Sequence, residues 1–164
     1  MAGTNERYAE ALVRREMKIE LGNNGFGHVY VQGEKCAVSA INNALRQAGG
    51  KPKVCPLSDY TPRTVSSKSA MPEFVITFNS DLNTVLVVEC KKSISQHESD
   101  DKDQPSKYAV DGVLYYAKYL KEEFNVIAVA ESGIDVDKML VSTFYWPKNQ
   151  KDYVEYVKIR NIIL

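Results

Sequence analysis

The chain has 164 residues, 44% of them hydrophobic and 26% charged, and its formal net charge is zero. This length suits one domain with a substantial core, and the composition is ordinary for a soluble globular protein. No apolar run approaches the roughly 20 residues needed to span a bilayer, and the N-terminus lacks the basic-then-apolar order of a signal peptide. The zero net charge does not mark the chain as a nucleic-acid binder. Its three cysteines have no metal-ligand spacing and fit free thiols in a reducing cytosol.

The first expected element is a helix over residues 4–21, which Gly22 would end. At about 100° per residue its apolar side chains form one wide arc, with Glu10 at the edge of the arc and Glu16 inside it. The elements expected after it are a turn cluster at 23–27, a short strand at 28–31 and a second helix at 35–48.

A long irregular stretch is expected at residues 51–71. Between residues 44 and 72 five Lys and Arg residues stand against Asp59 as the one acidic residue. Loops this long inside a compact domain tend to be functional or mobile, and basic side chains suit a phosphate backbone. We therefore expect a loop that contacts DNA, with Lys68 and Ser69 nearest to the site described below. A solvated basic loop explains the same composition and stays an alternative.

A β-hairpin is expected from two β-like runs, residues 74–78 and 84–91, which flank a turn rich in Asn, Ser and Asp. The second run is so apolar that it predicts a strand covered on both faces, as in the centre of an α/β sheet. Side chains alternate along a strand, so Glu89 and Lys91 share one face and Cys90 lies on the other.

Glu73 opens the first strand of this hairpin, and strand pairing is expected to bring it close to Glu89. Two such carboxylates repel unless one is protonated or a cation lies between them. A hard divalent ion with oxygen ligands, Mg²⁺, resolves the repulsion, and Lys91 could then orient a water or stabilise a developing anion. The alternative without function is a solvated ion pair of Glu89 and Lys91 at a strand end.

The remaining elements are expected as a polar loop at 93–103, a helix at 105–122, a buried strand at 126–130, a peripheral strand at 138–146 and a short helix at 152–159. Pro105 suits the first turn of its helix. Connected through that helix, the strand at 126–130 can lie parallel to the strand at 84–91. His97 has no second histidine at ligand spacing, so we expect it at the surface.

The dipeptide Pro72-Glu73, followed by Glu89-Cys90-Lys91 on an apolar strand, resembles the signature of the PD-(D/E)XK nuclease superfamily. Further along, Gln104-Pro105-Ser106-Lys107-Tyr108 is similar to the QxxxY element of the RecB-like and type I restriction branches. Residues 108–117 resemble the N-terminal nuclease domains of restriction enzymes, including those fused to methyltransferase or helicase parts. The resemblance covers residues 5–146 and departs from the family pattern in having Glu, not the commoner Asp, at position 73.

This resemblance implies an α/β fold of restriction-endonuclease type, a central mixed sheet flanked by helices on both faces, in a single nuclease domain over residues 1–164. It implies an endonuclease that hydrolyses DNA phosphodiester bonds with Mg²⁺, or with Mn²⁺ in its place. The apolar end of the chain predicts excision from a larger restriction-modification protein with methyltransferase, helicase or specificity parts. We expect a bacterial or phage-like cytoplasmic protein that acts on DNA, away from membranes; a homodimer for double-strand cleavage stays open.

The family also implies roles for particular residues. Glu73 and Glu89 would bind the metal with the carbonyl of Cys90 and a glutamate of the first helix, for which Glu10 is preferred to Glu16. Gln104 and Tyr108 would face the metal site from the first turn of their helix. The residues expected to act in catalysis are Glu73, Glu89, Lys91, Gln104 and Tyr108. The residues expected to contact DNA are Lys68, Ser69, Lys92 and Lys107.

Three alternatives stay open at this stage. A Holliday-junction resolvase of the same superfamily is typically a strongly basic dimer, and the neutral charge argues mildly against it. A non-catalytic DNA-binding or assembly module on a nuclease fold is disfavoured by the intact Glu89 and Lys91. A protein-interaction domain with a coincidental motif would bind no divalent metal.

Overall fold

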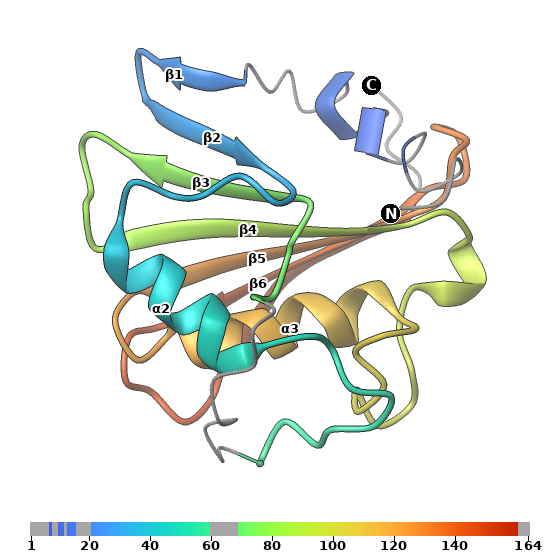
Figure 1. Cartoon of the computed structure of the whole chain (residues 1–164). Helices are drawn as coiled ribbons and strands as arrows, with labels where there is room; N and C mark the ends of the chain where they lie inside the picture. The colour runs from blue at the N-terminus through green and yellow to red at the C-terminus, as the bar shows by residue number, and fades with distance from the viewer. Residues whose placement is uncertain (1–6, 8–9, 12, 16–20, 60–68, 161–164) are drawn as a thin grey trace.

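In the part of the chain that the structure describes, seven strands form one mixed sheet, side by side in sequence order (Figure 1). This computed structural model describes residues 7, 10–11, 13–15, 21–59 and 69–160. The strands are β1 (Gly22–Asn24), β2 (Gly27–Val31), β3 (Phe74–Phe78), β4 (Thr84–Lys91), β5 (Asn125–Ser132), β6 (Leu140–Trp146) and β7 (Val154–Arg160). The helices are α2 (Ser39–Ala48), the short 3₁₀ helix η1 (Ile94–Gln96) and α3 (Ala109–Leu120), and the described residues among 7–15 are also helical.

One pair of neighbouring strands is parallel. β4 and β5 run side by side with Glu89 opposite Ala130, whereas the other neighbouring strands pair antiparallel. Helix α3 makes the crossover that a parallel pair needs, because a tight turn cannot connect two such strands. The hairpin strands predicted at residues 74–78 and 84–91, and the parallel placement of the strand that follows α3, are confirmed.

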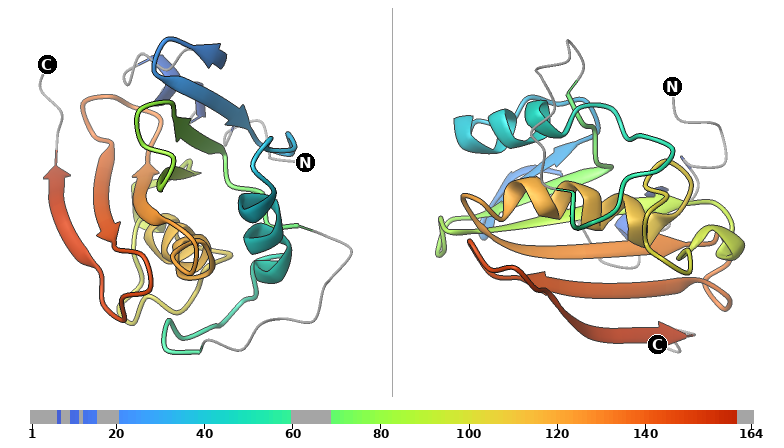
Figure 2. Two further views of the ribbon diagram at one scale, coloured as in Figure 1. Left: turned by 90° about the vertical axis from the view of Figure 1, so that its left-hand side faces the viewer. Right: turned by 90° about the horizontal axis from the view of Figure 1, so that it is seen from below.

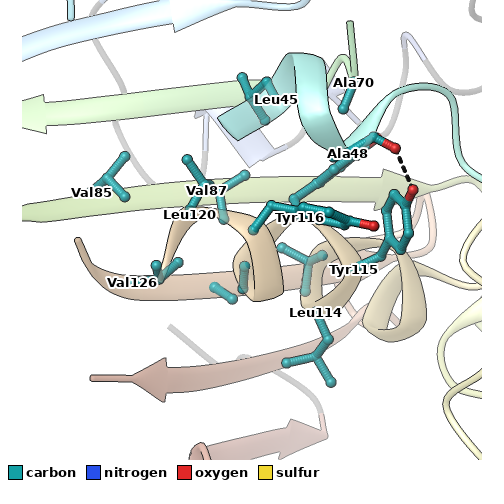
Figure 3. Close-up of a cluster of buried hydrophobic side chains, with 14 of the residues drawn as sticks. Leu45, Ala48, Ala70, Val85, Val87, Leu114, Tyr115, Tyr116, Leu120 and Val126 are labelled. Carbon is teal, nitrogen blue, oxygen red and sulfur yellow. Dashed lines mark hydrogen bonds between the residues drawn. The ribbon is translucent and has the colours of Figure 1, made fainter. Parts of the chain in front are cut away.

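Both faces of the sheet are covered. Helices α2 and α3 lie on the same side, where they bury Val85 and Val87 of β4 in the larger of two cores (Figures 2 and 3). On the other face the helical residue Val13 packs with Phe74 and Cys90 in the smaller core. The predicted α/β class, a mixed sheet with helical segments packed against both faces, is therefore confirmed.

Helix α2 begins later than the expected residue 35. The side chain of Asn42 donates to the carbonyl of Cys36 at 2.6 Å and accepts from its amide at 3.1 Å, so a side-chain clamp replaces the first helical turn. At its other end α2 is tied to α3, because the Tyr115 hydroxyl donates to the carbonyl of Ala48 (Figure 3). The two helices thereby cover the sheet as one layer.

Helix α3 begins at Ala109, so the prediction that Pro105 occupies its first turn is wrong. Tyr108 is extended, with φ −112° and ψ 145°. The buried carboxylate of Asp111 accepts from the amide of Ser99 at 3.1 Å and from that of Gln104 at 2.9 Å. These bonds fasten the polar loop between β4 and α3 to the helix, so the residues before Ala109 form a turn and are not part of α3.

The surface position expected for His97 is also wrong, since only 4% of this residue is exposed. Its Nδ1 lies 2.7 Å from the Ser132 hydroxyl and its Nε2 lies 2.8 Å from the Ser142 hydroxyl. A polar loop residue thus reaches into the sheet and joins the loop to β5 and β6, where each ring nitrogen has a partner.

The short helix expected at residues 152–159 is wrong as well, because β7 occupies these positions. Valine, tyrosine and isoleucine recur in this segment and favour a strand that packs on its neighbour. β7 pairs with β6 through a bulge at Thr143 and Phe144, and the ring of Tyr156 lies 6.0 Å from that of Tyr145. Pairing with β6 satisfies backbone groups that an isolated short helix would leave to water.

One buried carboxyl lies on the smaller-core face. Glu131 stands beside Cys90 in the β4–β5 register and is 1% exposed. Among the described residues neither of its carboxyl oxygens has a hydrogen-bond partner. Burial raises the pKa of Glu131 to about 9, and the neighbouring Cys90 side chain offsets this only in part. The carboxyl is therefore neutral at pH 7.

This environment predicts a pH-dependent effect of Glu131→Gln on stability. Between the ordinary pKa near 4.5 and the folded value near 9 the folded chain binds more protons than the unfolded chain, so stability falls as pH rises. E131Q removes that loss. Urea unfolding should show similar free energies of unfolding for both proteins at pH 5 and an advantage of about 2–4 kcal/mol for E131Q at pH 8. An equal difference at both pH values would contradict the assignment.

Candidate active site

The pairing of β3 with β4 brings Glu73 and Glu89 together. Phe74 lies opposite Val88, and the amide of Glu73 donates to the carbonyl of Val88 at 3.0 Å. The Glu73 carboxyl also accepts from the amide of Cys90 at 3.1 Å. The two carboxyls therefore meet on the α3 side of the sheet, as the alternation along the strands predicts.

Two lysines neutralise Glu89, which is fully buried. The Lys91 ammonium lies 3.4 Å from Oε1 of Glu89, in keeping with their shared face of β4. The Lys51 ammonium, from the loop after α2, contacts the same oxygen. Sequence reasoning had placed Lys51 only in a basic loop, although the glycines that end α2 signal a turn of the chain at this point.

Burial and charge set the proton positions in this pair. Burial raises the pKa of Glu73 well above its usual range, and the neighbouring Glu89 raises it further. Burial also raises the pKa of Glu89, but Lys51 and Lys91 outweigh burial and hold that pKa below its usual value. Of the two carboxyls, Glu89 is therefore the one that ionises more readily, and Glu73 is the one that holds its proton more tightly.

The second carboxyl oxygen of Glu89, Oε2, is buried. Among the described residues it has no hydrogen-bond partner. A buried lone pair without a donor is unfavourable, and a proton or a cation at this place relieves it.

Helix α3 faces the pair through two residues that the sequence did not single out. A Cβ on Gly112 would lie 3.2 Å from Cγ of Glu89 and 3.0 Å from the carbonyl oxygen of Pro105, so a side chain here would press on the carboxylate. One helical turn later, Tyr116 is buried, and burial followed by the charge of Glu89 raises the pKa of its hydroxyl. The i, i+4 spacing of these residues could have indicated this face of α3.

Gln104 and Tyr108 occupy the turn before α3. The amide of Gln104 donates to Asp111, its carbonyl accepts from the amide of Tyr108 at 3.2 Å, and the ring of Tyr108 lies 5.1 Å from the Lys107 ammonium. These contacts stay within the turn and do not reach Glu89. The prediction that both lie in the first helical turn is therefore wrong, because α3 starts after them, and their role in catalysis stays a prediction.

The other candidate metal ligands lie around Cys90. Its side chain is buried in the smaller core, as predicted, and its amide holds Glu73. Burial raises the pKa of the Cys90 thiol, and neighbouring glutamates, of which Glu10 has the smallest effect, raise it further. Glu10 belongs to the helical segment whose Val13 packs with Cys90 in the smaller core, on the face away from α3. The competing Glu16 lies outside the described residues.

Three of the four expected DNA contacts are exposed. They are Ser69, Lys92 and Lys107. Ser69 lines a pocket of about 250 Å³ between β2, α2 and the segment before β3, which Lys35 and Arg46 also line. Lys68 lies outside the described residues. The two exposed cations of this set, Lys92 and Lys107, both lie in the segment between β4 and α3.

Within the described ranges, no group of three or more His, Cys, Asp or Glu side chains could hold a metal ion by itself. An ion at this place would depend on Glu73, Glu89, a backbone carbonyl and water. That set suits Mg²⁺, which keeps several waters and uses one or two carboxylates.

Comparison of the chain with protein-family models, with curated proteins and with solved structures finds no match. No helix of the described part of the chain combines the length and the apolar character needed to cross a membrane. The function of the chain is therefore inferred from the geometry of the carboxyl pair.

The order of the two pKa values predicts that two conservative changes lower the free energy of unfolding by different amounts. Glu89→Gln leaves Lys51 and Lys91 without a buried counter-charge and should cost about 3 kcal/mol of unfolding free energy. Glu73→Gln replaces a neutral carboxyl with a neutral amide and should change it by less than about 1 kcal/mol. Urea unfolding of the metal-free proteins at pH 7 measures both values. Equal losses in E73Q and E89Q would show that the charge is not confined to Glu89.

Proposed function

We propose that the chain is a nuclease domain of restriction type that hydrolyses DNA phosphodiester bonds with Mg²⁺. The observation that carries this proposal is the meeting of Glu73, Glu89 and Lys91 at one end of the β3–β4 pair, where the buried Oε2 of Glu89 has no hydrogen-bond partner among the described residues. The mixed sheet with helical segments on both faces supports a fold of restriction-endonuclease type. The resemblance of residues 72–73, 89–91 and 104–108 to the PD-(D/E)XK pattern agrees with both.

The residues of this chain have separate roles in the proposed reaction. Glu73, Glu89 and the carbonyl of Cys90 would hold the ion. When bound, such an ion polarises the phosphate and lowers the pKa of a coordinated water. Lys91, fixed on β4, orients the attacking water and offsets negative charge on the phosphate as it becomes pentacoordinate.

The remaining residues position the site and the substrate. Gly112 lets α3 approach Glu89 closely, so the carboxylate is shielded from bulk water and the electrostatic interactions inside are strengthened. The exposed Ser69, Lys92 and Lys107 offer a hydroxyl and two ammoniums to the DNA backbone. Contacts of this kind orient a duplex without selecting a base sequence.

A non-catalytic DNA-binding module is the second candidate, and one observation favours it. Lys51 and Lys91 together neutralise Glu89 without a metal ion. A domain that kept the fold but had lost cleavage would tolerate such an arrangement. Its DNA binding would be insensitive to a chelator.

Plasmid nicking separates the two functions. We expect cleavage by the full chain with Mg²⁺ or Mn²⁺ and none with a chelator. Lys91→Ala should lower the rate at least about 100-fold, since it removes a cation next to the reacting phosphate, and Glu89→Ala at least as much. The matched controls, K148A and E123A, change exposed residues and should cleave like the original chain. Full activity in both E89A and K91A would refute the nuclease assignment.

A further inference from the structure

The loop after α2 delivers a second ammonium to Glu89. Gly49, with φ 62°, ends the helix and turns the chain toward the sheet. Two residues later the Lys51 ammonium contacts Oε1 of Glu89 and lies 5.3 Å from the ring centre of Tyr116. This lysine belongs to an irregular segment and not to the strands that form the carboxyl pair.

Two ammoniums already lie on Glu89 before any divalent ion is present. Among the described contacts, those of Lys51 and Lys91 both lie at its Oε1. A divalent ion added to this set would leave surplus positive charge in a buried site, where like charges repel strongly. One of the ammoniums must therefore withdraw when the ion enters.

The structure distinguishes the two lysines. Lys91 is in the centre of the sheet, and its carbonyl accepts from the amide of Gly133 at 2.9 Å, so its backbone is fixed. The Lys51 side chain is more exposed, 18% against 10% for that of Lys91, and its backbone lies in a loop. Lys51 is therefore the lysine nearer to solvent, and its backbone is not part of the sheet.

We propose that Lys51 is a positioning residue that occupies the cation place on Glu89 in the metal-free protein and withdraws when a divalent ion binds. The proposal rests on the proposed function, because it takes Glu73 and Glu89 as the metal ligands. Lys51 then competes with the ion for Oε1 of Glu89. It keeps the buried carboxylate neutralised while no ion is bound, and it weakens the apparent affinity for the ion.

Calorimetric titration of the chelator-treated full chain with Mn²⁺ tests this competition. Lys51→Met should bind Mn²⁺ at least about tenfold more tightly than the original chain, because no ammonium has to leave. Lys51→Arg keeps the charge and should restore weaker binding. Lys53→Met changes an exposed lysine of the same loop and should leave the affinity unchanged.

A measurement on the unaltered chain avoids any folding defect of K51M. Reductive methylation followed by mass spectrometry should label Lys51 several-fold faster after Mg²⁺ is added, while labelling of Lys53 stays constant. If the original chain binds Mn²⁺ but K51M binds no more tightly and Mg²⁺ leaves Lys51 labelling unchanged, the inference about Lys51 is wrong and the nuclease proposal stands. If no variant binds Mn²⁺, both are wrong.

Discussion

The ion pairs on Glu89 are the interaction on which the rest of the site depends. A fully buried carboxylate is unfavourable unless its charge is compensated, and both compensating ammoniums bind one of its oxygens. This arrangement requires the β3–β4 register, since a shift by one residue would turn Glu89 to the face where Cys90 packs. The strand register that packs Cys90 in the core is therefore the same register that brings Glu89 to its two lysines.

The buried Glu89 also needs a close-fitting cover that excludes water, and helix α3 provides it. Every residue of this helix is buried, so it has no free polar face and must pack on all sides. Its contact with the carboxyl pair is made by Gly112 and Tyr116, one turn apart, and Tyr115, just before the latter, bonds to α2. One buried helix thus closes the site and also makes β4 and β5 parallel.

The sequence predicted the elements whose pattern is local and strong. The alternation and apolar run of residues 84–91 and the turn before them were sufficient for the hairpin and for the meeting of Glu73 and Glu89. Tertiary contacts decided the rest. Lys51 reaches Glu89 across 38 positions of sequence, and the buried place of His97 depends on two serines in later strands. No local pattern reports such partners.

Errors at the ends of elements have a similar origin. The sequence favoured a helix from Pro105, but the side chain of Asp111 binds the preceding turn and delays the helix by several residues. The helix expected at residues 152–159 is a strand because these residues pair with β6, and that pairing is visible only in three dimensions. Intrinsic preference was overridden in each case by a specific partner.

Asp111 has a role in the geometry that goes beyond the loop it fastens. Because this carboxylate gathers the amides of Ser99 and Gln104, it fixes how far α3 is rotated about its own axis relative to the sheet. Gly112, the next residue of the helix, stands over Glu89, where a Cβ would lie 3.2 Å from Cγ of the glutamate. The bonds that fasten the loop are thus also placed to keep a residue without a side chain over the buried carboxylate.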